Sequence, residues 1–157
     1  MKPFQAKEGA VTLDQIFSAA NFVALCCWLL LVALPRKRWV ANGVAGVAVP
    51  SLFAALYTGV IAAHLADSEG GFSTLSGVAL LFSNPWLLLA GWIHYLAFDL
   101  LVGAWESRDA RERGISHLLV VPCLILTFLF GPAGWLLYLG VRSLSGLAVQ
   151  TELKTAH

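Results

Sequence analysis

The stretch Trp86-Leu-Leu-Leu-Ala-Gly-Trp-Ile-His-Tyr-Leu-Ala-Phe-Asp-Leu-Leu-Val-Gly-Ala-Trp105 decides the fold class of this chain. A helix of about 20 residues extends about 30 Å, which is the thickness of the hydrocarbon core of a bilayer. Within the stretch only His94 and Asp99 carry side chains that ionise near neutral pH. The stretch therefore predicts a transmembrane helix that holds two polar side chains inside it.

The composition of the whole chain also indicates a membrane protein. The 157 residues are 59% hydrophobic and 12% charged, with a mean hydropathy of +0.77, whereas a soluble domain carries about 25% charged residues. The formal net charge is only +1, so the chain has no field that would attract a polyanion. We expect membrane lipid around the protein and no nucleic-acid partner. The three cysteines lie in apolar runs, which argues against a disulfide framework.

Three further apolar runs, over residues 13–34, 40–65 and 117–141, predict spans on either side of 86–105. The expected fold is all-α: a polytopic membrane protein with a four-transmembrane-helix bundle in a single domain, 1–157. The apolar run 72–82 is too short to span a bilayer, so it predicts a short re-entrant or interfacial helix between the second and third spans. Gly131-Pro132 predicts a break in the fourth span, which either lines a cavity or packs against a neighbouring helix.

Lysine and arginine in the loops predict the orientation of the bundle. Six of them follow the first and third spans: Arg36, Lys37, Arg38, Arg108, Arg111 and Arg113. Four belong to the opposite side: Lys2, Lys7, Arg142 and Lys154. This difference predicts that both basic loops are cytoplasmic and that both termini are non-cytoplasmic.

Asp99 is the residue that a membrane helix tolerates least. A carboxylate in the hydrocarbon core raises the free energy of insertion by about 2.5–3.5 kcal/mol, so a retained aspartate suggests a functional group. The alternative is that Asp99 accepts hydrogen bonds from a neighbouring helix and holds the bundle together. His94 lies about 140° away around a regular helix and does not face Asp99. Tyr95, one turn earlier, is placed to donate its hydroxyl to the carboxylate.

The chain lacks the motifs that bind nucleotides or catalytic metals. It contains no G-x-G-x-x-G, G-x-x-x-x-G-K-[ST], H-E-x-x-H or C-x-x-C pattern, and its four histidines are scattered. We therefore expect neither a cofactor nor a bound metal ion.

The part of the chain from Asn84 to Arg142 resembles the abscisic-acid-deficient-4-like family of four-helix membrane proteins. The resemblance rests on N-P-W at Asn84, on W-x-H-x-x-x-x-D from Trp92 to Asp99 followed ten residues later by Asp109, and on G-P-x-G from Gly131. Plant members of this family are associated with neoxanthin synthesis in plastids. This chain is short and shows no plastid transit peptide, so the resemblance implies a bacterial member in the inner (plasma) membrane.

The resemblance implies an isomerase that converts an epoxy-carotenoid or a related isoprenoid epoxide into an allenic alcohol. Such a reaction needs an acid and a base and no redox cofactor. The residues implied for catalysis are His94, Asp99 and Asp109. Those implied for contact with a hydrophobic isoprenoid or carotenoid are Asn84, Trp92, Tyr95 and His117. A homo-oligomer is compatible with this reading.

Two other functions fit the same residues. The chain could be a carotenoid- or lipid-binding accessory protein that presents its ligand to another enzyme and performs no catalysis. It could also be a small proton-coupled transporter subunit, although four helices are few for transport and no inverted repeat is visible.

Overall fold

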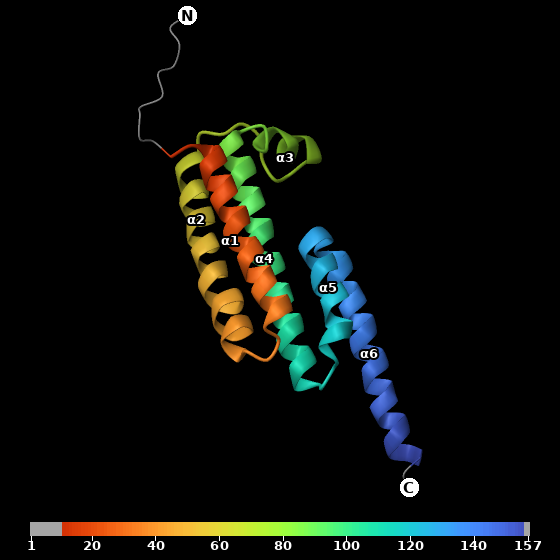
Figure 1. Ribbon diagram of the computed structural model, residues 1–157. Coiled ribbons are helices and arrows are strands. Elements are labelled where there is room, and N and C mark those ends of the chain that lie inside the picture. The colour runs from red at the N-terminus through yellow and green to blue at the C-terminus, as the bar shows by residue number, and fades with distance from the viewer. Residues whose placement is uncertain (1–10, 156–157) are drawn as a thin grey trace, which may run out of the picture.

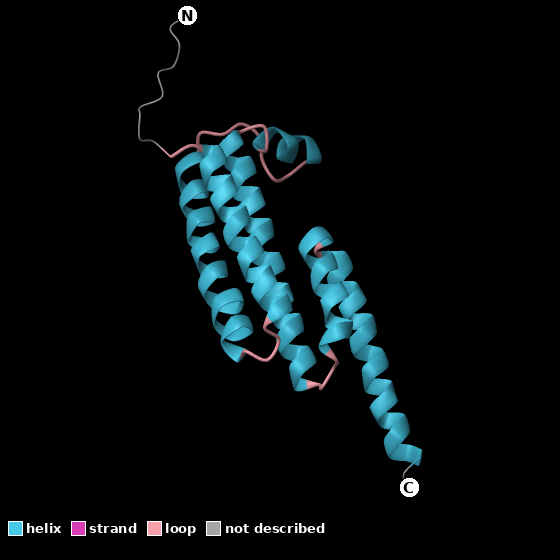
Figure 2. Ribbon diagram, in the orientation of Figure 1, coloured by secondary structure: helices cyan, strands magenta, loops and turns pink. Residues whose placement is uncertain are grey.

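The computed structural model describes residues 11–155, with side chains up to residue 146, and consists of helices joined by short loops (Figures 1 and 2). No β-strand occurs in this part of the chain, so the all-α prediction is confirmed. The elements in chain order are α1 (Leu13–Ala33), η1 (Val40–Ala48), α2 (Val49–His64), α3 (Leu75–Leu81), α4 (Pro85–Glu112), α5 (His117–Phe130) and α6 (Pro132–Thr155).

Three apolar segments are long enough to cross a membrane: α1, the continuous η1–α2 segment and α4. They pack side by side in an antiparallel bundle (Figure 1). This confirms three of the four predicted spans and makes the chain an integral multi-pass membrane protein. The first of these helices begins at a capping box, in which the side chains of Thr12 and Gln15 each accept a hydrogen bond from the other residue's backbone N–H.

α4 continues beyond the predicted span, which ends at residue 105, as far as Glu112. Its start is fixed by Asn84, whose side chain accepts a hydrogen bond from Trp86 N, and by Pro85 in the first turn. The charged residues after Trp105 stabilise this continuation of the helix, because side chains of opposite charge lie three and four residues apart. Glu106 and Asp109 are therefore helical residues and do not belong to a loop.

The segment Val40–Ala48 is a π-helix that leads directly into α2. Arg108 of α4 donates from Nη1 to Ala41 O at 2.7 Å and so joins this segment to α4.

The short helix between the second and third spans is α3, which is capped by Thr74. It lies at the end of the bundle where α1 and α4 begin (Figure 1). The short helix predicted between the second and third spans is thus present.

The prediction of a fourth single span over 117–141 is wrong. α5 ends at Phe130 after 14 residues, about 21 Å of helix, which is too short for a bilayer. The chain then reverses, and α6 runs back beside α5 as a helical hairpin (Figure 1). The tip of this hairpin reaches only part of the way along α4 (Figure 1).

The sequence G-P-x-G causes the reversal. Gly131 adopts φ +41°, a left-handed conformation that side chains disfavour. Pro132 has no backbone N–H and fits the first turn of α6. A Cβ at Gly134 would overlap the backbone nitrogen and the hydroxyl oxygen of Thr127, so only glycine allows α6 to pack this closely against α5. The break at Gly131-Pro132 was predicted either to line a cavity or to pack against a neighbouring helix. The close contact of the adjoining Gly134 with α5 supports the packing role.

The hairpin also corrects the predicted topology. The described part of the chain begins at one end of the bundle and ends at the opposite end (Figure 1), so the two ends do not share a side. Arg142 and Lys154 lie on the returning helix. Together with the three basic residues of the α1–η1 loop and the three at the end of α4, they place eight of the ten Lys and Arg residues toward one end. The other two, Lys2 and Lys7, lie outside the described residues.

Candidate functional site

Asp99 lies at the centre of α4, where the turn of the α5–α6 hairpin meets that helix. It is the fifteenth residue of the 28 in α4. A Cβ at Gly131 would lie 2.8 Å from Asp99 Oδ1, so the turn rests directly on the carboxyl group. The other oxygen, Oδ2, is buried and has no hydrogen-bond partner among the described residues. Asp99 thus brings an unsatisfied acidic oxygen to a break in the hairpin.

Tyr95 binds the end of α5 one turn before Asp99. Its hydroxyl lies 3.2 Å from Phe128 O and 3.4 Å from Leu129 O and donates to these carbonyls. The last carbonyls of a helix have no partner within the helix, so Tyr95 supplies one. The sequence placed this hydroxyl against Asp99, and in the structure it lies close to that carboxyl group as well as to the two carbonyl groups of the hairpin.

Glu106 is the second acidic residue on the same face of α4, two turns after Asp99. It is 0% exposed, and Thr127 of α5 donates to its Oε1 at 2.9 Å. Its Oε2 is buried without a partner among the described residues. Between the two acids, Gly103 leaves the space that the Trp28 indole of α1 fills. The face of α4 toward the hairpin therefore carries the half-buried carboxyl group of Asp99 and the fully buried one of Glu106, with an aromatic ring between them.

Asp109, predicted to be catalytic, is the centre of an ion-pair network. It pairs with Arg113 at 2.9 Å and with Arg142 at 3.0 Å. The hydroxyl of Tyr138 donates to its Oδ2 at 2.7 Å. Arg142 also lies over the Trp105 ring. Because its partners come from α4 and α6, Asp109 fastens the returning helix of the hairpin to α4.

His94, also predicted to be catalytic, lies on a different face of α4 from Asp99. Its ring stacks on Phe98 at 4.5 Å and lies 5.4 Å from the Tyr57 ring of α2. It lines an apolar groove of about 210 Å³ formed by α2, α4 and the α3 region. The structure therefore separates His94 from Asp99, as the 140° angle between them indicates, and the three residues predicted for catalysis do not form one site.

The residues predicted to contact a ligand are spread over both ends of the bundle. Asn84 caps α4 and donates to Ser68 Oγ at 3.0 Å. Trp92 donates to Asn21 Oδ1 at 3.0 Å and borders a lipid-facing groove of about 320 Å³ between α1 and α4. His117, at the opposite end, lies 2.8 Å through Nε2 from Val32 O. Among the predicted contacts, only Trp92 and Tyr95 belong to the face that carries Asp99.

Sequence reasoning missed four residues of this region: Glu106, Thr127, Tyr138 and Arg142. The sequence places Glu106 on the same helical face as Asp99, since the two are seven residues apart. The predicted site omits it because the charged residues after Trp105 are typical of a solvated segment. The other three residues could be found only after the hairpin brought α5 and α6 against α4.

The arrangement can hold and exchange a proton within the membrane. Asp99 and Glu106 each keep a free oxygen in a region packed by Trp28 and by the α5–α6 hairpin. No group of three or more His, Cys, Asp or Glu side chains within residues 11–146 is arranged to hold a metal ion. The available chemistry is that of carboxyl groups in a low-dielectric environment.

The three spans, the half-length hairpin and the carboxyl group at its turn define a multi-pass membrane protein with an acidic residue at its centre. Comparison with known sequences gives its family. Residues 15–138 match the model of the ABA4-like (ABA DEFICIENT 4-like) family, and the chain belongs to that family. No curated protein and no solved structure matches the chain. The family match covers the first two spans as well as the part that shows the motifs, and it ends within α6.

Proposed function

We propose that the chain is a cofactor-independent acid/base isomerase of an epoxy-carotenoid or a related isoprenoid epoxide, and that Asp99 transfers the proton. The observation that carries the proposal is the free, buried Oδ2 of Asp99 beside Gly131, at the middle of a membrane helix. A carboxyl group in that position makes insertion less favourable, and the neighbouring helices leave one of its oxygens without a hydrogen bond. The family resemblance supplies the class of substrate.

The reaction conserves atoms and electrons, and a single carboxyl group is sufficient for it. The protonated acid donates to the epoxide oxygen while the carbon–oxygen bond opens. The resulting carboxylate removes a proton from the neighbouring polyene carbon, and those electrons form the allene. The carboxyl group returns to its starting form, and substrate and product have the same composition. Because His94 faces another part of the bundle, the proposed mechanism uses no imidazole.

The half-length hairpin supports entry of a substrate from the lipid. The groove between α1 and α4 lies beyond the hairpin turn and is lined mainly by apolar side chains, among them Phe17, Leu88 and Trp92. Trp92 packs against Tyr95, with their ring centroids 5.3 Å apart, and Tyr95 is one turn from Asp99. An elongated apolar molecule lying in this groove would bring its end group along the aromatic side chains toward Asp99.

Co-expression with a violaxanthin-producing pathway tests the proposal. The chain, its Asp99→Asn variant and its Asp67→Asn variant are compared by chromatography of the pigments at equal membrane levels. Asp67 is an exposed acid in the α2–α3 loop and controls for the same chemical change. We expect a product of unchanged mass with the chain and with Asp67→Asn, and none with Asp99→Asn. A chain that makes no product, or an active Asp99→Asn variant, overturns the proposal. Pigment that co-purifies without conversion assigns the chain to the accessory, binding-only function.

One observation favours a second candidate, a proton-coupled transporter subunit. Helices that break within the membrane, next to a carboxyl group, are a feature of transporters, and the α5–α6 hairpin breaks beside Asp99. Proton flux into liposomes that contain the purified chain tests this function. Flux that is lost in Asp99→Asn and kept in Asp67→Asn supports it, and absence of flux with the unchanged chain rejects it.

We propose further that the chain lies in the plasma membrane of a bacterium with its basic end in the cytoplasm. The asymmetry of eight Lys and Arg residues toward one end supports this orientation. It places the end of α6 in the cytoplasm and the start of α1 on the opposite side.

A further inference from the structure

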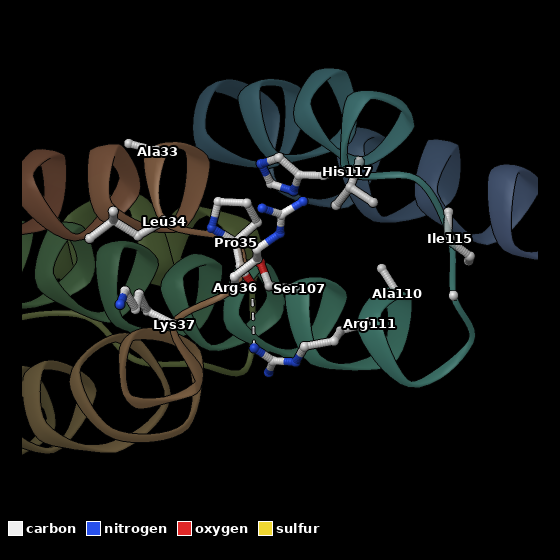
Figure 3. Close-up of a pocket in the computed structure, with 12 residues that line it drawn as sticks. Ala33, Leu34, Pro35, Arg36, Lys37, Ser107, Ala110, Arg111, Ile115 and His117 are labelled. Atoms are coloured by element: carbon white, nitrogen blue, oxygen red, sulfur yellow. Dashed lines mark hydrogen bonds between the residues drawn. The ribbon is translucent and has the colours of Figure 1, made fainter.

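The basic end of the bundle contains a hollow of about 610 Å³. Three segments meet around it: the α1–η1 loop, the last turns of α4 and the start of α5. Figure 3 shows Arg36, Arg111 and His117 around this space, with Lys37 at its edge. We call it the basic hollow, and its lining residues used here are Leu34, Arg36, Lys37, Arg111, Ile115, His117 and Val120. It lies outside the face of α4 that holds Asp99.

The charge of the basic hollow has one sign. No aspartate or glutamate lines it. The ion pairs formed by the described residues join Arg113 and Arg142 to Asp109, so the cations of the hollow are not neutralised by them. Arg111 is held in place by donation from Nη1 to Pro35 O at 3.4 Å. The side chains of Arg36, Lys37 and Arg111 are therefore available to an anion, and Arg111 is positioned by its hydrogen bond to the backbone.

The start of α5 adds to this positive potential. α5 begins at His117 in the wall of the hollow, and its N-cap, Ser116, makes no side-chain hydrogen bond to the first turn. The first N–H groups of a helix lack partners within the helix and carry partial positive charge. Helix N-termini with open N–H groups bind phosphate.

The remaining wall of the hollow is apolar, with Leu34, Ile115 and Val120 beside the cations. A purely ionic ligand would leave these side chains unused. An amphiphile whose phosphate group faces the cations and whose hydrocarbon chain lies on the apolar wall would contact both.

We infer that the basic hollow is a binding site for the phosphate group of an anionic amphiphile. Phospholipids and prenyl diphosphates share this chemistry. The site is independent of the isomerase proposal, since it uses no residue of the Asp99 face and predicts binding rather than turnover.

Native mass spectrometry of the full chain in neutral detergent tests this site. The probes are phosphatidylglycerol, farnesyl diphosphate and inorganic diphosphate, with zwitterionic phosphatidylcholine as the comparison lipid. We expect at least one anionic probe to bind ten or more times more tightly than phosphatidylcholine. If inorganic diphosphate displaces the bound anionic amphiphile, the phosphate group alone is sufficient for binding. If phosphatidylglycerol is the probe that binds most tightly, the site is a lipid site. If farnesyl diphosphate binds most tightly, the site is a prenyl diphosphate site.

Two neighbouring arginines provide a matched pair of variants. Arg36 lines the basic hollow, and Arg38, two residues later in the same loop, does not. Both are exposed, so Arg36→Gln and Arg38→Gln make the same change in net charge with little effect on folding, which thermal unfolding checks. We expect Arg36→Gln and Arg111→Gln each to weaken binding about fivefold, the effect of one cation near a phosphate, and Arg38→Gln to weaken it less than twofold. Equal effects of Arg36→Gln and Arg38→Gln, or equal binding of anionic and zwitterionic lipid, overturn the inference.

Discussion

The packing of α6 on α5 is tested most directly by comparing alanine at two glycines of α6. In Gly134→Ala the new Cβ overlaps the nitrogen and the hydroxyl oxygen of Thr127, and a helix backbone does not move away cheaply. In Gly140→Ala the new Cβ meets nothing within 4 Å. Alanine favours a helix over glycine by roughly 0.5–1 kcal/mol at both positions, so this contribution cancels between the two variants. Overpacking costs about 1–3 kcal/mol, and we expect Gly134→Ala to be less stable than Gly140→Ala by that amount.

Unfolding of the purified chain by sodium dodecyl sulfate in mixed micelles, followed by tryptophan fluorescence, measures this difference. The expected gap corresponds to a change of about 5- to 150-fold in the unfolding equilibrium constant. If residues 117–141 formed one continuous helix, Thr127 and Gly134 would be seven residues apart along it and would not touch across a hairpin. Both alanine variants would then have similar stability, and that result would refute the hairpin.

Three further predictions concern the topology, the contact of the hairpin with Glu106 and the N-cap of α4. A green fluorescent protein fused after α6 is expected to fluoresce in a bacterial host and an alkaline phosphatase fused there to stay inactive, since the returning helix ends at the basic end; the opposite pattern contradicts the topology. Thr127→Val is expected to destabilise the protein by about 1–3 kcal/mol in the same unfolding assay, because it removes the hydrogen-bond donor to buried Glu106. Thr127→Ser keeps that donor and is the control. A free energy of unfolding for Thr127→Val close to that of the unchanged chain would count against the hydrogen bond. Asn84→Ala is expected to cost about 1 kcal/mol through loss of the α4 cap; if only pigment conversion fell and stability did not, Asn84 would have the ligand-contact role that the sequence suggested.

The spans could be predicted because hydropathy and helix caps are properties of residues adjacent in the sequence. The run Trp86–Trp105 needed no partner to be recognised as a membrane helix. The charged residues 106–112 are typical of a solvated extension of the helix, but Glu106 faces the protein interior and is 0% exposed. Burial of a charged residue depends on what the rest of the chain packs against it, and hydropathy does not contain that information.

The candidate site was predicted only in part for the same reason. Asp99 was identified from the energetic cost of an acid in hydrocarbon, and its separation from His94 followed from helical geometry alone. The sequence identifies Asp109 as an acidic residue, which is compatible with a catalytic as well as a structural role. Only its neighbours in space, Arg142 and Tyr138 of α6, show that it joins two helices.

Local patterns thus sufficed for the helical class, the membrane environment, three spans and the acidic residue at the centre of the third. Folding in three dimensions determined where residues 117–155 go. Gly131-Pro132 marks a break in any reading, but a break is compatible with a kink as well as with a reversal. The reversal follows from contacts between residues far apart or on facing helices, such as Gly134 on Thr127 and Gly131 on Asp99, and a linear pattern does not specify which helices will face each other.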